Sequence, residues 1–165
     1  MSGVKGQRAI MAAVSPEGAI GQGGTIPWHY RGDMRRVKRL TMGTTLVMGR
    51  ITWESLGGRP LPGRRNLVVT RRDLPGVECF RDIPAALEAA EGAVWFFGGA
   101  RIYHDAMPFA DLIDLVYVPD HVTDPNAVKF PPIDPLLWDA GPLLAHEDEP
   151  ALQRRVYTRK PPLRR

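Results

Sequence analysis

Five short runs of largely apolar residues recur along this 165-residue chain, and they constrain its fold most strongly. They occupy residues 8–14, 44–48, 66–70, 93–97 and 113–118. Nearly continuous apolar runs of this length are typical of strands that are buried on both faces of a sheet. Helical patterns lie between them, at residues 33–41, 52–56, 83–90 and 102–107. The alternation predicts an α/β fold with a mixed, mostly parallel central sheet flanked by helices on both faces.

The last part of the chain follows a different pattern. Residues 119–150 are rich in proline and irregular, with one extended piece at Val128–Phe130, and Gln153–Arg159 has the pattern of a strand. We expect this last strand to be antiparallel, at the C-terminal edge of the sheet. The length fits a single domain over residues 1–165, with flexible tails at 1–8 and 160–165.

Composition excludes several classes of protein. The single cysteine, Cys79, is incompatible with a disulfide framework or a cysteine-rich metal site. The four histidines, His29, His104, His121 and His146, stand apart in the sequence, so we expect surface residues and no bound metal. No apolar run is long enough for a transmembrane helix, and no signal peptide precedes the first strand. We therefore expect a cytoplasmic protein, monomeric and without a membrane partner.

A small excess of positive charge points to an anionic partner. The chain has 22 lysines and arginines against 18 acidic residues, a net charge of +4. Nucleic acid, a membrane surface or a phosphorylated small molecule would fit this balance. A nucleic-acid-binding module needs arginines interleaved with aromatic residues on one face. The arginines here stand beside glycines at strand ends, which favours a small molecule.

Glycines and cationic residues follow three of the predicted strands. Gly49-Arg50 and then Thr52 follow the second apolar run, Thr70-Arg71 follows the third, and Gly98-Gly99 follows the fourth. The carboxyl ends of parallel strands meet at one edge, where helix N-termini offer free N–H groups and arginine binds phosphate through two bonds. Neither a G-x-G-x-x-G pattern nor a P-loop is present. The edge predicts a site for a multi-phosphate ligand, such as a dinucleotide with an extra phosphate.

One acidic residue, Asp33, stands at the start of a predicted helix, directly after the aromatic segment Trp28-His29-Tyr30. By position alone, the aspartate is expected to cap the helix N-terminus. The sequence contains no Ser-His-Asp set and no H-E-x-x-H motif that would offer another chemistry.

Several motifs, in order along the chain, resemble those of the dihydrofolate reductase family. They are Gly18–Gly21, Ile26–Trp28, Asp33, Val47–Ser55, Arg59–Asn66 and Phe97–Tyr103. The resemblance runs from about Ala9 to Phe130. It implies an enzyme that transfers hydride from NADPH to C6 of 7,8-dihydrofolate, which gives tetrahydrofolate.

The resemblance also implies roles for individual residues. Asp33 would bond N3 and the 2-amino group of the pterin, Trp28 would share the catalytic centre, and a proton would reach N5 through water. Arg64 would clamp the substrate's α-carboxylate, and residues 18–28 would form a mobile loop over the nicotinamide. The other implied substrate contacts are Met11, Ala12, Met34, Val37, Leu56, Leu61, Phe97, Tyr103 and Val116. The implied cofactor contacts are Ala13, Ile20, Gly21, Gly49, Arg50, Ile51, Thr52, Thr70, Arg71, Gly98, Gly99, Ala100, Arg101 and Ile102.

A few positions depart from the family's pattern. Val37 stands where an aromatic residue is usual, Phe97 where a β-branched aliphatic residue is usual, and Ala100 replaces the third glycine of a run. The family has a threonine whose hydroxyl supports the aspartate. A gapless alignment places Val116 there, and a one-residue slip places Tyr117 there. The departures leave open a reductase of the same fold that acts on another pteridine or on a pyrimidine of flavin synthesis.

Overall fold

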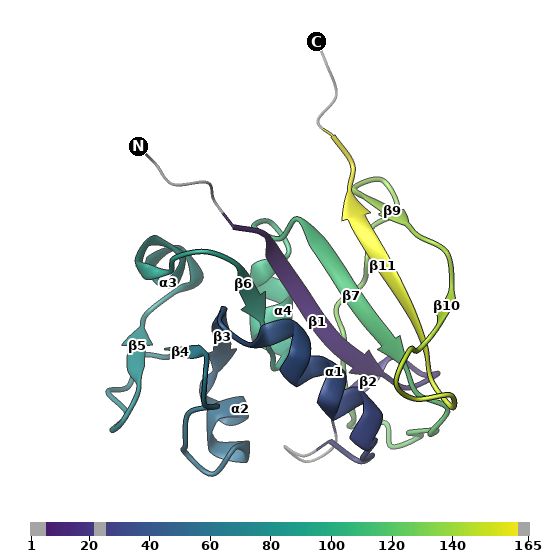
Figure 1. The fold of residues 1–165 in the computed structure, drawn as a ribbon, viewed down its shortest axis with the longest axis horizontal. Coiled ribbons are helices and arrows are strands. Elements are labelled where there is room, and N and C mark those ends of the chain that lie inside the picture. The colour runs from purple at the N-terminus through teal and green to yellow at the C-terminus, as the bar shows by residue number, and fades with distance from the viewer. Residues whose placement is uncertain (1–5, 22–25, 162–165) are drawn as a thin grey trace.

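Strand β1 (Arg8–Val14) lies in the middle of a nine-stranded sheet (Figure 1). The computed structural model describes residues 6–21 and 26–161. The other strands of this sheet are β3 (Thr45–Gly49), β4 (Arg65–Val69), β5 (Glu78–Phe80), β6 (Val94–Phe96), β7 (Leu112–Tyr117), β9 (Trp138–Ala140), β10 (Leu144–Ala145) and β11 (Gln153–Arg159).

The strands follow the order β10-β11-β7-β1-β6-β3-β4-β5, and β9 also pairs with β11. Every pairing from β7 to β5 is parallel, whereas β11 runs antiparallel to β7 and to its partners β9 and β10. The predicted mixed sheet with an antiparallel C-terminal edge is confirmed. A second small sheet joins β2 (Ala19–Gly21) to β8 (Val128–Lys129).

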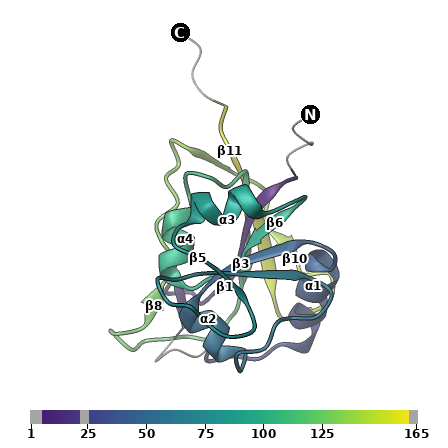
Figure 2. The ribbon, with the colours of Figure 1, turned by 90° about the vertical axis from the view of Figure 1, so that its left-hand side faces the viewer.

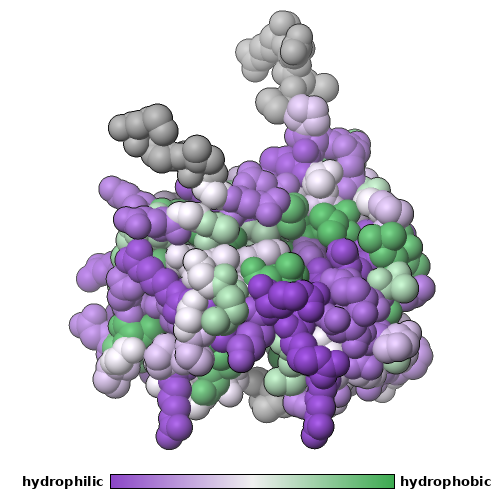
Figure 3. Space-filling view, in the orientation of Figure 1, coloured by the Kyte–Doolittle hydropathy of each residue, from purple (hydrophilic) through white to green (hydrophobic). Residues whose placement is uncertain are grey.

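Helices cover both faces of the large sheet, as the sequence predicts. Helices α1 (Arg31–Thr41) and α2 (Arg50–Ser55) pack on one face, and α3 (Ile83–Ala89) and α4 (Ala100–Ala106) pack on the other. Figure 1 looks onto the face that carries α1, and Figure 2 shows the sheet from its β5 side. The outer face of α1 carries exposed arginines and Lys38, and hydrophilic side chains are prominent over this part of the surface (Figure 3).

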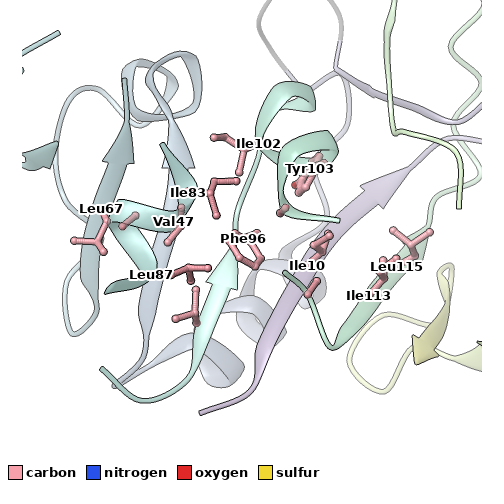
Figure 4. Packing of buried hydrophobic residues seen from close by; sticks show 14 of the residues in the cluster. Ile10, Val47, Leu67, Ile83, Leu87, Phe96, Ile102, Tyr103, Ile113 and Leu115 are labelled. Carbon is pink, nitrogen blue, oxygen red and sulfur yellow. The ribbon is translucent and has the colours of Figure 1, made fainter. Parts of the chain in front are cut away.

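The alternation of side chains along the buried strands supplies both layers of the core. Ile10 of β1 and Phe96 of β6 are fully buried on the α3 and α4 face (Figure 4). Ala9 and Met11 of β1 point to the opposite face and join Met48 in a second cluster. Burying an aliphatic or aromatic side chain of this size contributes about 1.5–3 kcal/mol. A strand with apolar residues at nearly every position therefore stabilises both layers at once.

Element boundaries differ from the predicted ones mainly where polar residues dominate. Helix α1 begins at Arg31 rather than Asp33, with Tyr30 as its N-cap and no side-chain cap. Position 32, inside the helix, requires glycine, because an added Cβ would stand only 2.1 Å from the carbonyl oxygen of Asp148. The short strands β2, β9 and β10 were not expected, since two or three residues carry no readable alternation.

The two ends of the described chain are attached to the sheet. The carbonyl oxygen of Gln7 accepts from Val94 N–H, and Lys160 N–H donates to Leu137. Of the predicted tails at 1–8 and 160–165, residues 1–5 and 162–165 lie outside the described residues. Among the residues that are described, no helix is long and apolar enough to cross a membrane.

Candidate active site

Two helix N-termini meet at the carboxyl ends of β3 and β6. Gly49 is the N-cap of α2 and Gly99 the N-cap of α4, and Gly49 N–H donates to the carbonyl oxygen of Gly98 over 2.7 Å. The Gly98–Gly99 peptide is cis, and Gly98 has a φ of +102°, which requires glycine. Neither cap residue has a side chain to bond the first helical N–H groups, so these donors are available to a phosphate.

The other predicted cofactor residues surround this pair of helix ends. Arg50, Ile51 and Thr52 form the first turn of α2, and Ala100, Arg101 and Ile102 form the first turn of α4. No described residue other than glycine has a positive φ, so the methyl group of Ala100 is accommodated without strain. Arg50 is paired within its own helix, where its Nη1 donates to both carboxylate oxygens of Glu54 at 2.8 and 2.9 Å.

Three arginines line one cavity of about 920 Å³ that is bordered by the start of α3 and by α4. Arg71 follows β4, Arg101 belongs to α4, and Arg81 follows β5. Arg81 was missed by the sequence reasoning. Arg81, like Arg71, is a cation directly after a parallel strand. That strand, β5, has only three residues, and so short a strand has only a weak pattern in the sequence. Three guanidinium groups at one cavity suit a ligand with a phosphate beyond the pyrophosphate.

Five of the predicted substrate contacts lie in one apolar cluster on the α1 face of the sheet. They are Met11, Val37, Leu56, Leu61 and Phe97. They come from the middle of β1, the middle of α1, the C-cap of α2, the loop after α2 and the residue after β6, so the fold brings together residues that are far apart in sequence. Met34, another predicted contact, is 55% exposed on the same helix.

Arg64 lies at the C-terminal end of α1. Its Nη1 donates to the Thr41 hydroxyl at 3.1 Å and its Nε to the Pro62 carbonyl at 3.0 Å. Burial lowers the pKa of this guanidinium, which still carries its charge at neutral pH. Thr41 and Asp33 are eight residues apart on α1, or about 12 Å along the helix axis.

Asp33 is the third residue of α1 and not its N-cap, so the capping interpretation is wrong. Its Oδ1 lies 3.0 Å from Nε2 of His146. His146 is 4% exposed, which contradicts the expectation of a surface histidine; the side chains of His104 and His121 are mostly exposed, as expected. No sequence motif marked His146, because 113 residues separate it from Asp33.

The alternation along β7 decides which residue faces α1. Asp114 reaches Arg36 of α1, and Val116, two residues on, therefore faces the same side. Tyr117 points to the other face, where its hydroxyl pairs with that of Tyr157 at 3.0 Å and burial raises its pKa to about 12. Of the two candidates, Val116 is therefore the one that faces α1.

Trp28 packs between two small clusters that include Val116 and Ala19. Ala13 also packs beside Val116, and Ile20 packs against the α4 face of the core. Glu17 fixes the start of the glycine-rich loop: it bonds His121 Nδ1 at 2.5 Å and Val122 N–H, and the His121 bond holds its pKa at about 2. Residues 22–25 of the predicted mobile loop lie outside the described residues.

Tyr103 and Ala12 lie on the α4 side of β1. The Tyr103 hydroxyl donates to the Met11 carbonyl at 2.8 Å, and complete burial raises its pKa well above the ordinary value. Ala12 packs against the same core. Tyr103 and Ala12 therefore lie on the opposite face of the sheet from the apolar cluster that contains the Met11 side chain.

Comparison with known proteins decides the family. The dihydrofolate reductase family model matches residues 8–157. A dihydrofolate reductase of Neisseria meningitidis is 40% identical over 134 residues, which cover 78% of this chain and 82% of that protein. The type 3 enzyme of Salmonella typhimurium is 41% identical over 115 residues, covering 67% and 70%.

The chain belongs to the dihydrofolate reductase family. The Enterococcus faecalis dihydrofolate reductase, solved with NADP(H) and RAB-propyl, superposes with a TM-score of 0.82 at 28% identity, over 95% of this chain and 98% of that one. This dihydrofolate reductase is an NADPH-dependent oxidoreductase, and the alternatives of a flavin-pathway reductase or a nucleic-acid-binding module are not supported.

Proposed function

We propose that this dihydrofolate reductase holds the pterin ring of dihydrofolate at Asp33 and the glutamate α-carboxylate at Arg64. One observation carries the proposal. The Asp33 carboxylate in the first turn of α1 and the partly desolvated Arg64 guanidinium beside its last turn flank an apolar cluster, and Asp33 and Thr41, which Arg64 contacts, are about 12 Å apart along the helix axis. This separation suits a substrate that is amidine-like at one end, aromatic in the middle and anionic at the other end.

Asp33 supplies the only charge that the proposal places beside the pterin. Its carboxylate accepts two parallel N–H bonds from the amidine-like edge of the ring, a geometry that fixes the ring plane. A negative charge held in place there favours the protonated pterin, which accepts hydride more readily. The apolar side chains of Met11, Val37 and Phe97 exclude water around the ring and strengthen this attraction.

The cofactor is proposed to lie along the joined N-termini of α2 and α4. Gly49, Gly98 and Gly99 allow close approach of its pyrophosphate, and Arg71, Arg81 and Arg101 face its extra phosphate. When bound there, NADPH supplies the hydride. Ile51 and Ile102 belong to the same first helical turns. In this proposal Ala13 of β1, Ile20 and Gly21 of β2, and Trp28 in the loop before α1 border the nicotinamide end.

Replacing Asp33 by asparagine tests the anchor. The amide keeps the size of the side chain but cannot hold the protonated pterin as an ion pair, so we expect kcat/KM for dihydrofolate to fall at least about a hundredfold. The affinity for NADPH, measured by fluorescence titration, should stay within about twofold. Asp73→Asn removes an exposed carboxylate outside the site and serves as control. An Asp33→Asn enzyme with normal turnover would refute the assignment.

We also propose that the enzyme acts as a monomer in the cytoplasm. The proposed site is built entirely from one chain, and the single cysteine needs no oxidising compartment. Sedimentation equilibrium at micromolar protein should give the mass of one 18.3 kDa chain. A mass of twice that value would contradict the proposed monomer.

A further inference from the structure

His146 is a buried imidazole whose two ring nitrogens both have partners. It follows β10, and its side chain is inaccessible to solvent. Nε2 lies 3.0 Å from Oδ1 of Asp33, and Nδ1 lies 3.0 Å from the backbone nitrogen of Asp148. In Figure 1 the chain between β10 and β11 lies beside α1, the helix that carries Asp33.

The partner of Nδ1 determines the proton position on the ring. A backbone N–H only donates, so Nδ1 must accept and carries no hydrogen. The single ring hydrogen is then on Nε2 and points to Asp33. His146 therefore acts as a neutral hydrogen-bond donor to the carboxylate, and its contact with Asp33 needs no second proton.

The chain around His146 is fixed against α1 by hydrogen bonds and by close packing of the backbone. Gly32 N–H donates to Glu149 at 3.0 Å, Arg36 Nε bonds Glu147 at 2.9 Å, and Arg39 Nη1 bonds Asp148 at 2.7 Å. The backbone of Gly32 also approaches Asp148 so closely that a methyl group would stand 2.1 Å from its carbonyl oxygen. Segment and helix thus hold His146 at a defined distance from Asp33.

We propose that His146 is a positioning residue that orients the Asp33 carboxylate for dihydrofolate. The inference rests on the proposed anchoring role of Asp33. A carboxylate has about four lone-pair positions, and the bond to Nε2 uses one of them on Oδ1. The others remain for the two N–H groups of the pterin. Val116, which faces α1 from β7, offers no hydroxyl, so the donor for Asp33 comes from the C-terminal part of the chain.

Two amide variants separate the two ends of the imidazole. In His146→Asn the amide oxygen replaces Nδ1 and can still accept from Asp148, but no donor reaches Asp33. In His146→Gln the amide nitrogen reaches the position of Nε2 and restores the donor to Asp33. Both variants remove the ring, so a loss that comes only from packing would affect them equally.

We expect His146→Asn to lower kcat/KM for dihydrofolate about tenfold, equivalent to about 1.4 kcal/mol, mainly through a higher KM. His146→Gln should recover to within about threefold of the wild type. The affinity for NADPH should stay within about twofold in both variants. In an Asp33→Asn background, His146→Asn should have no further effect, which a double-mutant cycle would show as full coupling.

The proposal is overturned if His146→Asn leaves the dihydrofolate KM unchanged, if His146→Gln does no better than His146→Asn, or if dihydrofolate and NADPH binding weaken together. The Asp33→Asn enzyme distinguishes the two levels of the argument. If it is inactive while the His146 variants behave as wild type, only the positioning role fails. If it is fully active, the anchor itself fails.

The wild-type protein gives a test that does not depend on any variant folding. Nitrogen chemical shifts of the His146 ring, measured by NMR at neutral pH, should show hydrogen on Nε2 and none on Nδ1. A ring protonated on Nδ1 would overturn the assignment of the donor.

Discussion

At the scale of single residues, the contact between Asp33 and His146 joins α1 to the segment between β10 and β11. Apolar residues such as Val37 and Phe97, and arginines at strand ends, could be identified from the sequence; in the fold Val37 and Phe97 pack in one apolar cluster, and Arg71 lines the cavity. The partner of Asp33 could not be read. His146 is distant from Asp33 in sequence, and a lone histidine in an irregular segment is expected at the surface. Only the pairing of β11 with β7 places the segment of His146 beside α1.

The arginine cavity leads to a prediction about cofactor choice. Arg71→Ala and Arg81→Ala each remove a guanidinium from the wall of the cavity that we propose for the extra phosphate of NADPH. Each should raise the KM for NADPH about tenfold, in line with loss of one strong charge-assisted hydrogen bond, and leave the KM for NADH nearly unchanged. Steady-state kinetics with both cofactors measures the difference.

Arg72→Ala is the matched control, because Arg72 follows the same strand but does not line the cavity. Equal losses with NADPH and NADH in the Arg71 and Arg81 variants would show that these arginines do not face the extra phosphate.

At the scale of elements, α1 is held by charges as well as by its apolar face. Arg36 Nη2 and Asp114 Oδ2 of β7 are 2.6 Å apart, with side chains that are 3% and 6% exposed. The other oxygen of Asp114 is buried without a hydrogen-bond partner. The sequence could not have paired these two residues. Asp114 interrupts an apolar run, and its partner is identified only once α1 crosses β7.

The buried pair should be costly to break and easy to replace. Arg36→Met leaves the Asp114 carboxylate buried and unpaired, and we expect it to lower the free energy of unfolding by about 3–5 kcal/mol. The double variant Arg36→Met/Asp114→Leu should recover most of this loss, since a well-packed apolar pair of similar volume is often as stable. Urea unfolding followed by tryptophan fluorescence measures all three proteins.

Arg35→Ala, an exposed position on the same helix, should change stability by less than about 0.5 kcal/mol. A double variant as unstable as Arg36→Met alone would mean that the contacts of Arg36 with Glu147, and not those with Asp114, hold α1 in place.

At the scale of the whole molecule, one sheet carries both proposed binding regions. This arrangement could be predicted from the long buried strands. The parallel order, the helices on both faces and the antiparallel C-terminal edge all followed from the apolar runs and their spacing. The short strands β9 and β10 could not be predicted, because two or three residues show no alternation and form a strand only by pairing with β11. The edge they build holds the segment on which His146 stands.

Cofactor binding should stabilise the whole fold, because α2, α4, β3, β4 and β6 all border the proposed cofactor edge. At a concentration about one hundred times its Kd, NADPH should add about 2.7 kcal/mol to the free energy of unfolding. For a domain of this size we expect a rise in Tm of about 5–11 °C, measured by differential scanning calorimetry. NADH at the same concentration should raise Tm less. The difference should disappear in an Arg71→Ala/Arg81→Ala protein; its persistence there would contradict the assignment.

The contact between Asp33 and His146 also sets an order of events on the ribosome. The glycines and arginines of the proposed cofactor edge are all translated by residue 101, whereas the donor to Asp33 is the 146th residue and is seated only when β10 pairs with β11. Chains emerge from their N-terminal end. A nascent chain therefore presents the glycines and arginines of the proposed cofactor edge before the residue that donates to Asp33 has been made.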